Sequence, residues 1–351
     1  MRTYLDHNAT TPLRAEAREA MIAALAVAGN PSSVHAEGRS AKMLVEQARA
    51  QVAALVGCRP QQVVFTSSAT EAAALAVAQK ARHGGVFAAL PTEHDCLGVW
   101  GEIPFEAETF AGLAAISAAN SETGLLGDAG RVAGSTDRYS TICDITQLAG
   151  KMPVIYGDVT PSYAILSGHK IGGPKGVGAL INFTANDPEP LLRGGGQEMN
   201  RRSGTENVIG LAGFGAAAEA AARDVAAGAW DEVAQFRNIL ENAIAACCDQ
   251  TIFVGKGQPR LPNTTCMLTP GWKGETQVMQ MDLAGFAVSA GSACSSGKVK
   301  ASKVLQAMGF SDTDAASAIR VSLGLETTQE DVLRFADAWA DKWKKHQMRA
   351  A

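Results

Sequence analysis

Several features that mark large classes of protein are missing from this sequence. No apolar run is long enough to cross a bilayer, since the longest ones, residues 20–28 and 208–218, fit alanine-rich core helices better. Residues 1–11 hold no basic stretch followed by an apolar one, so we expect no signal peptide. Repeats and low-complexity segments are absent as well. The expected location is therefore the cytoplasm, with no membrane partner.

An excess of charge and a pattern of cysteines are also missing. The chain has 31 Lys and Arg against 35 Asp and Glu, a mildly acidic balance that argues against a dedicated binder of nucleic acid. Its seven cysteines form no C-x-x-C pair, so zinc-ribbon and thioredoxin-like sites lack support and no metal site is expected. Neither a P-loop nor a G-x-G-x-x-G turn between strand and helix is present, which disfavours a nucleotide-binding enzyme.

The sequence does contain a regular alternation of strands and helices. Apolar spacing predicts helices over residues 14–28 and 36–56, the second stopped by Gly57. Short β-rich runs alternate with further helical segments up to about residue 183, which predicts an α/β fold with a mostly parallel, covered sheet. The expected strands are residues 62–66, 86–90, 113–118, 141–144, 163–167 and 177–183.

Beyond about residue 223 this alternation gives way to a different pattern. A long helix over residues 230–247 leads into shorter mixed elements, which end with helices over 302–308 and 329–345. The 351 residues are enough for two domains, and 46% hydrophobic residues are ordinary for a globular protein. We therefore expect a second, smaller α+β domain.

Two segments at expected strand ends carry side chains that suit a phosphorylated ring. Ser67 to Thr70 lie between a strand and a helix. The free N–H groups of a helix N-terminus can bind a phosphate, although ordinary helix capping is the commoner use of such residues. Asp144 ends a strand and Gln147 follows it. A carboxylate there can keep a heterocyclic nitrogen protonated, and a helix cap is the alternative.

Two further segments carry nucleophiles. Lys170 follows a strand and precedes glycines; a desolvated lysine can form a Schiff base, although most lysines lie solvated on the surface. Cys294 lies among small, flexible residues, 289–297, which favour a reactive thiol over the buried, inert state that is commoner for cysteine. Jointly, a phosphate-binding turn, a pyridinium partner, a Schiff-base lysine and a free thiol predict a pyridoxal-phosphate enzyme.

The chain resembles, nearly from end to end, the cysteine desulfurases of the class V aminotransferase family, in the NifS/IscS-like group. The segments that carry the resemblance occur in the order found in that family, and several are highly specific. They are Tyr4-Leu-Asp-His-Asn-Ala-Thr10, Gly29-Asn-Pro-Ser-Ser33, Thr92-Glu-His94, Asn120-Ser-Glu-Thr-Gly124, Ser167-Gly-His-Lys170, Gly194-Gly-Gly-Gln-Glu198, Arg201-Arg-Ser-Gly-Thr-Glu-Asn207, Gly291-Ser-Ala-Cys-Ser-Ser296 and Ile319-Arg-Val-Ser-Leu-Gly324.

This resemblance implies a type I aminotransferase fold with a mostly parallel sheet of the seven-stranded type. It also implies a homodimer with its sites near the subunit interface. A large domain that binds pyridoxal phosphate would span residues 13–240. Residues 1–12 and 241–351 would form a small domain, which carries the loop with Cys294.

The resemblance also implies a role for each matched residue. Lys170 would join pyridoxal 5'-phosphate as a Schiff base, and His94 would stack on the ring and help with proton transfers. Asp144 would pair with the pyridinium nitrogen, Gln147 would hydrogen-bond the phenolic oxygen, and Cys294 would be the nucleophile. The phosphate would be bound by Ala69, Thr70, Ser167 and His169, and by Thr205 of the neighbouring subunit. The carboxylate region of the substrate would be bound by Asn30, Asn120 and Arg320, whose guanidinium can grip a carboxylate bidentately.

The implied activity converts L-cysteine to L-alanine and transfers the sulfur to Cys294 as a persulfide. The sulfur would pass on to an acceptor, either a scaffold protein for iron–sulfur cluster assembly or a small thiol. Two alternatives stay open. One is a selenocysteine lyase or another class V lyase or transaminase, against which the cysteine-bearing loop argues. The other is a non-catalytic partner protein on the same fold, against which argue the intact Lys170, His94, Asp144 and Cys294.

Four departures from the family's usual pattern are visible. His7 and Ser121 each stand where the family usually has Asn. Ser68-Ala69 replaces the usual Gly-Gly before Thr70, which adds side chains beside the phosphate site. Residues 95–119 form a stretch that is short for the family, so we expect an outer strand and helix to be trimmed there.

Overall fold

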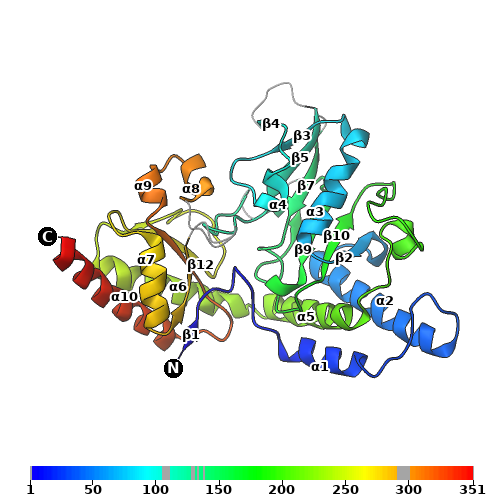
Figure 1. Cartoon of the computed structure of the whole chain (residues 1–351), viewed down its shortest axis with the longest axis horizontal. Helices are drawn as coiled ribbons and strands as arrows, with labels where there is room; N and C mark the ends of the chain where they lie inside the picture. The colour runs from blue at the N-terminus through cyan, green and yellow to red at the C-terminus, as the bar shows by residue number, and fades with distance from the viewer. Residues whose placement is uncertain are drawn as a thin grey trace. The chain divides into compact units, whose positions relative to one another are not determined.

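The structure, a computed structural model, describes residues 2–104, 111–127, 131–132, 134–136, 139–290 and 301–350. Contacts divide the chain into a large unit, residues 10–119 and 127–227, and a small unit, residues 1–9, 120–126 and 228–351 (Figure 1). The units change at residues 227–228, whereas the expected domain border at 240–241 falls inside a helix. The expected domain bounds stay a prediction. Within the described residues, no helix is both long enough and apolar enough to cross a membrane.

A seven-stranded sheet forms the centre of the large unit (Figure 1). Its order is β2-β10-β9-β7-β5-β3-β4, and neighbours run parallel except where β10 pairs with β2 and β9. The prediction of a mostly parallel, seven-stranded sheet is confirmed. β10 is reversed because residues 168–177, which join it to β9, hold a 3-10 turn and no crossover helix. The strands are β2 (Val63–Thr66), β3 (Phe87–Ala89), β4 (Ile103–Pro104), β5 (Gly112–Ser117), β7 (Tyr139–Asp144), β9 (Tyr163–Ser167) and β10 (Gly178–Asn182).

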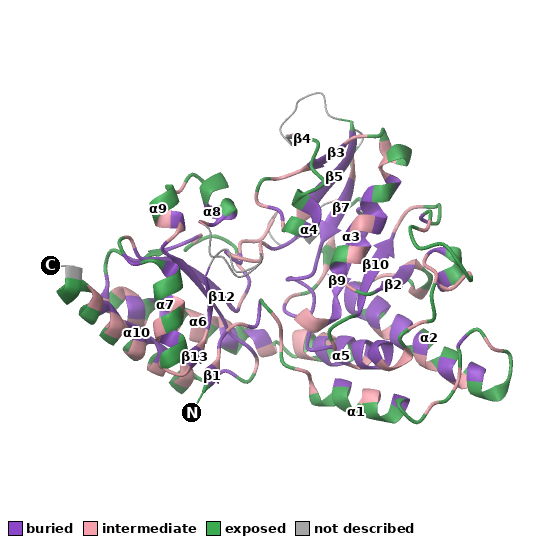
Figure 2. Ribbon diagram, in the orientation of Figure 1, coloured by how far each residue is buried: buried purple, intermediate pink, exposed green. Residues whose placement is uncertain are grey.

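Apolar strands and alanine-rich helices build the core of the large unit. Every residue of β9 and β10 is buried, as a sheet covered on both faces requires (Figure 2). Helix α3 packs against β9 and β10, and α5 packs against α1 and α2. The other elements of this unit are α1 (Ala15–Ala24), α2 (Ala36–Val56), η1 (Pro60–Gln62), α3 (Ala69–Val77), η2 (Ala78–His83), α4 (Asp95–Gly98), β6 (Arg131–Val132), β8 (Ile155–Tyr156), η4 (Gly168–Lys170), η5 (Glu198–Asn200) and α5 (Val208–Ala226).

The small unit is built on a four-stranded antiparallel sheet, in the order β11-β12-β15-β14. Strands β1 and β13 form a parallel pair of their own. Helix α6 packs against α10 and β12, and α7 packs against β13 and β15. The elements are β1 (Thr3–Tyr4), α6 (Ala229–Cys247), β11 (Ile252–Phe253), β12 (Thr264–Leu268), α7 (Gly274–Leu283), β13 (Phe286–Ala287), β14 (Ser289–Ala290), α8 (Lys303–Ala307), α9 (Asp312–Ala315), β15 (Ala318–Ser322) and α10 (Gln329–Ala350).

A stack of aromatic rings fixes α10 in the small unit. The ring centroid of the fully buried Trp272 lies 5.3 Å from that of Trp339 and 5.6 Å from that of Trp343. The imidazole of His346 stacks on the same indole at 5.5 Å. Trp339 Nε1 also donates a hydrogen bond to Gln277 Oε1 on α7 at 3.0 Å. Close ring contacts of this kind add to the free energy of burial, so the C-terminal helix is firmly held.

Candidate active site

Four strands of the large unit end at the same edge of the sheet. Gly178 pairs with Ser167 on one side and with Thr66 on the other, and Asp144 pairs with Ser117. The ends of β9, β7 and β5 are therefore neighbours, and the end of β2 lies at the same edge across the start of β10. In open α/β sheets ligands bind beyond such carboxyl ends. The segments that follow these ends carry Ala69, Thr70, Gln147, His169 and Lys170.

A tight turn after β9 carries His169 and Lys170. Thr11 holds this turn twice: its N–H donates to the carbonyl of His169 at 2.9 Å and its hydroxyl to that of Lys170 at 3.0 Å. His169 Nδ1 lies 3.1 Å from Thr10 Oγ1. Burial, followed by the charges of Lys170 and Lys175, lowers the pKa of His169 to about 4. Its ring is therefore neutral at neutral pH and can serve as a hydrogen-bond donor.

Two buried side chains are oriented at the end of β7. Asp144 is 8% exposed, and its Oδ1 accepts a hydrogen bond from the N–H of Thr146 at 2.8 Å. Within the described residues Oδ2 has no hydrogen-bond partner. Gln147 is also buried, and its Oε1 accepts from the buried amine of Lys151 at 3.3 Å. A fixed, buried carboxylate with an oxygen to spare suits a protonated ring nitrogen.

The N-terminus of α3 offers two backbone N–H groups to a ligand. Ser68 caps the helix by accepting from the N–H of Glu71 at 3.2 Å, and Glu71 Oε2 accepts from the N–H of Ser67 at 2.8 Å. Among the described residues, none accepts from the N–H of Ala69 or of Thr70. The capping alternative is thus correct for Ser68, while the next two positions keep the donors that a phosphate binds. Gly178 permits this packing, since a Cβ there would lie 2.5 Å from the carbonyl carbon of Ser68.

His94 precedes helix α4 and caps it with a ring nitrogen. His94 Nδ1 accepts a hydrogen bond from the N–H of Cys96 at 3.2 Å. The preceding Glu93 is 7% exposed and binds Ser117 at the end of β5. Sequence reasoning missed Glu93, although it lies inside a quoted motif, because the sequence does not show its distant partner.

A left-handed turn precedes the segment that carries Thr205. Glu198, Met199 and Asn200 have φ angles of 49°, 57° and 67°, a region that side chains rarely adopt. The carboxylate of Glu198 forms a buried, two-bond ion pair with Arg49, at 2.7 and 2.8 Å, which helps to fix the turn.

The residues after this turn are linked to the start of α3. Arg202 Nε donates to Glu71 Oε1 at 2.8 Å, and the same carboxylate accepts from Ser67. Thr205, predicted to serve the neighbouring subunit, is exposed. Asn30, predicted to bind substrate, is exposed as well, and its Oδ1 accepts from the N–H of Ser32 at 2.9 Å.

Arg320 is a buried, oriented cation of the small unit. It is 5% exposed on β15, where Nη2 donates to Asp6 Oδ1 at 2.8 Å and Nη1 to the carbonyl of Ser121 at 3.0 Å. Its buried Nε has no hydrogen-bond partner in the described part of the chain. Asp6 Oδ2 also accepts from Ser289 Oγ at 2.7 Å. The ion pair fixes the guanidinium, and the unpaired Nε–H can donate a hydrogen bond to an anionic ligand.

Asn120 forms a turn in the same unit. Its Oδ1 accepts from the N–H groups of Glu122 and Thr123, at 3.0 and 2.9 Å. Glu122 in turn binds Ser302 Oγ at 2.5 Å, at the start of α8. Cys294, the predicted nucleophile, lies outside the described residues, so the structure leaves its role a prediction.

One departure from the family pattern has a visible steric consequence. His7 is buried, and its ring lies against Gly324, where an added Cβ would be 2.0 Å from His7 Cε1. Only glycine fits at position 324 while His7 occupies this place.

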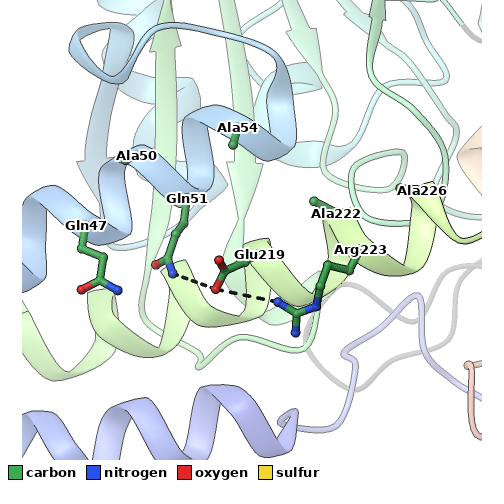
Figure 3. A pocket seen from close by; sticks show the side chains of 8 residues that line it. All are labelled: Gln47, Ala50, Gln51, Ala54, Glu219, Ala222, Arg223 and Ala226. Carbon is green, nitrogen blue, oxygen red and sulfur yellow. Dashed lines mark hydrogen bonds and ion pairs between the residues drawn. The ribbon is translucent and has the colours of Figure 1, made fainter.

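A separate groove of about 560 Å³ lies between α2 and α5 (Figure 3). Four alanines line it, and Gln51, Glu219 and Arg223 interact along it. None of the predicted site residues lines this groove, so we do not assign the candidate site to it.

Comparisons with known proteins identify the family of the chain. The aminotransferase class-V family model matches residues 3–106 and 107–335. A cysteine desulfurase of Klebsiella pneumoniae is 36% identical, over 94% of this chain and 89% of its own length. The cysteine desulfurase IscS of Dictyoglomus turgidum is 34% identical, over 94% and 91%.

A solved structure shares the fold over the whole chain. The NifS-like protein of Rickettsia africae matches with a TM-score of 0.86 and 28% identity, over 98% of this chain and 100% of that one. The expected type I aminotransferase fold is thereby confirmed. The chain therefore belongs to the aminotransferase class-V family, in its NifS/IscS-like group of cysteine desulfurases.

Proposed function

We propose that this chain is a cysteine desulfurase that uses pyridoxal 5'-phosphate to convert L-cysteine to L-alanine and passes the sulfur to Cys294. The observation that carries the proposal is the meeting of β2, β9, β7 and β5 at one sheet edge. This edge joins the amine-bearing turn of Lys170, the buried Asp144 and the N-terminus of α3. The relatives named cysteine desulfurase support the choice of substrate.

The residues at the sheet edge fit the cofactor. The N–H groups of Ala69 and Thr70, with Ser167 and the neutral His169, supply hydrogen-bond donors for its phosphate. Asp144 would keep the ring nitrogen protonated, and Gln147 would bind the phenolic oxygen. When bound, pyridoxal phosphate joins the amine of Lys170 and withdraws electrons from the substrate's Cα.

Proton transfer falls to Lys170 and His94. Once L-cysteine has displaced it, Lys170 Nζ takes the proton from the substrate's Cα. In neutral His94 the proton sits on Nε2, because Nδ1 accepts from the N–H of Cys96. His94 Nε2 can therefore donate a hydrogen bond or a proton during the reaction.

The substrate carboxylate is assigned to Arg320, with Asn120 and Asn30. Nη1 and Nη2 of Arg320 already bind Ser121 and Asp6, so the grip would be side-on, through Nε and an outer N–H of the guanidinium. This arrangement binds a carboxylate without loosening the ion pair that orients the cation.

Sulfur transfer requires a thiolate, which we assign to Cys294. The thiolate attacks the substrate sulfur, the Cβ–S bond breaks, and its electron pair is protonated on Cβ to give alanine. The sulfur stays on Cys294 as a persulfide until an acceptor, a scaffold protein or a small thiol, removes it. Both flanks of the segment are anchored in the small unit, by Ser289 to Asp6 and by Ser302 to Glu122.

The subunit arrangement belongs to the same proposal. We assign the enzyme a homodimeric state in which Thr205 reaches the phosphate in the neighbouring subunit. Its exposure and the link from Arg202 to Glu71, beside the phosphate-binding turn, support this assignment.

The proposal is tested by incubating the purified protein with L-cysteine and a reductant, and by assaying alanine and sulfide together. We expect equal amounts of both, and a visible absorption band of the bound cofactor that borohydride bleaches. Lys170→Ala should abolish the band and both products, while the exposed Lys175→Ala serves as the matched control.

Two further measurements separate the roles within the proposal. Cys294→Ala should keep the absorption band and lose sulfide release, and a normal rate in this variant would contradict the role of the thiol. Turnover of L-selenocysteine at a far higher kcat/KM than that of L-cysteine would instead favour the lyase alternative.

A further inference from the structure

Glu93 is a buried carboxyl group that the proposed chemistry does not use. Only 7% of the residue is exposed. Its Oε1 accepts a hydrogen bond from the N–H of Ser117 at 2.9 Å, and its Oε2 lies 2.5 Å from Ser117 Oγ. Both carboxyl oxygens of Glu93 are thus hydrogen-bonded to Ser117, the last residue of β5, which lies 24 positions further along the chain.

The bond to Ser117 fixes the place of the next residue, His94. The chain turns just before Glu93, whose N–H donates to the carbonyl of Leu90 at 3.0 Å. After it, His94 Nδ1 is held by the N–H of Cys96. The imidazole therefore sits between two fixed points, the carboxyl bound to β5 and the first turn of α4.

The same bond sets His94 beside the proposed cofactor partner. Ser117 pairs with Asp144 across β5 and β7, and the N–H of Ala118 donates to the carbonyl of Asp144 at 2.9 Å. Burial raises the pKa of Glu93 to about 7; hydrogen bonds from Ser117 lower it and the charge of Asp144 raises it. Among the described residues, the charged and titratable groups that face Glu93 are thus Asp144 on β7 and, at α4, His94 and Cys96.

We propose that Glu93 is a positioning residue of the reaction: its carboxyl fastens His94 to the end of β5, beside Asp144, and so holds the imidazole in place for proton transfer. This inference rests on the proposed function. A displacement of a reacting group by about 1 Å can lower the rate a hundredfold. We call the two hydrogen bonds between Glu93 and Ser117 the Glu93 clamp, and we expect its loss to slow the reaction.

Three variants test the clamp. Glu93→Ala removes it, and we expect kcat to fall about 10- to 100-fold with KM changed less than about threefold. Glu93→Gln keeps an acceptor for the N–H and a partner for the hydroxyl of Ser117, so it should restore kcat to within about threefold of the parent at a pH below 7. Ser117→Ala breaks one of the two bonds and should give an intermediate loss.

A readout independent of activity follows the imidazole itself. Histidine ¹⁵N spectra of the holoenzyme should show Nδ1 of His94 unprotonated in the parent and in Glu93→Gln, with a mixture of tautomers in Glu93→Ala. The visible circular dichroism of the bound cofactor should be as strong in Glu93→Gln as in the parent, and weaker in Glu93→Ala. Glu102→Gln is the matched control, because this carboxylate also accepts a strand N–H, that of Phe87 at 3.1 Å.

The outcomes separate this inference from the proposed function. A parent protein without the absorption band and without alanine formation refutes the proposed function, and this inference with it. The inference alone is overturned if the parent shows the absorption band and forms alanine, but Glu93→Ala has the same kcat and the same His94 ¹⁵N spectrum as the parent. Should Glu93→Ala fail to fold, unchanged His94 signals in Ser117→Ala overturn it equally.

Discussion

At the scale of single residues, two carboxyl groups, those of Asp144 and Glu93, are buried near the sheet edge. Burial raises the pKa of Glu93 from 4.5 to about 7. Because this folded-state pKa lies above the unfolded value, the folded protein binds more protons between pH 4.5 and 7. The contribution of Glu93 to stability is therefore present at low pH and is lost as the pH rises through 7.

Replacing Glu93 by Gln removes this pH dependence. Relative to Glu93→Gln, the free energy of unfolding of the parent should fall by on the order of 3 kcal/mol as the pH rises from 4.5 to 7. Urea unfolding at a series of pH values measures the difference. A constant difference between the two proteins would show that Glu93 titrates normally.

The contact between His7 and Gly324 predicts a strong coupling. Gly324→Ala should lower the free energy of unfolding by about 2 kcal/mol, because the new methyl group overlaps the ring of His7. In a His7→Ala background the same substitution should cost less, with a coupling of about 0.5–3 kcal/mol. Additive effects in this double-mutant cycle would speak against the overlap.

The residues that we assign to the cofactor could be proposed from sequence motifs, because each of them lies in a short run with its own chemistry. Glu93 and Arg202 were not singled out, since their roles depend on partners far away in the sequence, Ser117 and Glu71. A single sequence does not show such pairs. The contacts that position the site residues are therefore visible only in the folded structure.

At the scale of elements, the sequence predicted the end of a helix correctly where a glycine terminates it. Helix α2 ends at Gly57, with a left-handed φ of 67°, as predicted. Helix α1 ends at Ala24, whereas the pattern extended to residue 28, because no glycine or proline marks the true end. The left-handed turn at 198–200 was not predicted, since it contains no glycine and depends on the ion pair with Arg49.

Strain in this turn predicts opposite effects of two substitutions at Met199. Met199→Gly should raise the free energy of unfolding by about 1 kcal/mol, because glycine adopts a positive φ without steric cost. Met199→Val should lower it by a similar amount or more, since β-branched residues fit this region poorly. Met199 is 49% exposed, so little packing is lost in either variant, and chemical denaturation measures both.

The link from Arg202 to Glu71 predicts a contribution to cofactor affinity. Arg202→Ala should raise the dissociation constant of pyridoxal phosphate about 10-fold, because the carboxylate that holds the N–H of Ser67 loses its own partner. Titration followed by visible absorption measures the constant. Arg193→Ala, which breaks an exposed pair with Glu189, should leave it unchanged.

At the scale of the whole molecule, composition and pattern predicted two domains, but they did not predict which segments of the chain belong to each unit. Residues 120–126 belong to the small unit, although strands of the large sheet precede and follow them. Nothing in their composition marks this change, which only the long-range contacts reveal, such as that from Arg320 to Ser121.

Cofactor binding should stabilise the folded molecule by mass action. At a free concentration about 100-fold above its dissociation constant, pyridoxal phosphate should add about 2.7 kcal/mol to the free energy of unfolding. Lys170→Ala should reduce this gain, since it removes the covalent anchor. Thermal unfolding at several cofactor concentrations measures both, and a midpoint that does not move would argue against binding to the folded state.

The aromatic stack has a spectroscopic consequence. Of the five tryptophans, Trp230, Trp272, Trp339 and Trp343 lie in the small unit and Trp100 in the large one. Ultraviolet emission therefore reports chiefly on the small unit, while the visible absorption of pyridoxal phosphate, bound as we propose, would report on the large unit. A single denaturation experiment followed at both wavelengths would show whether the two units unfold together.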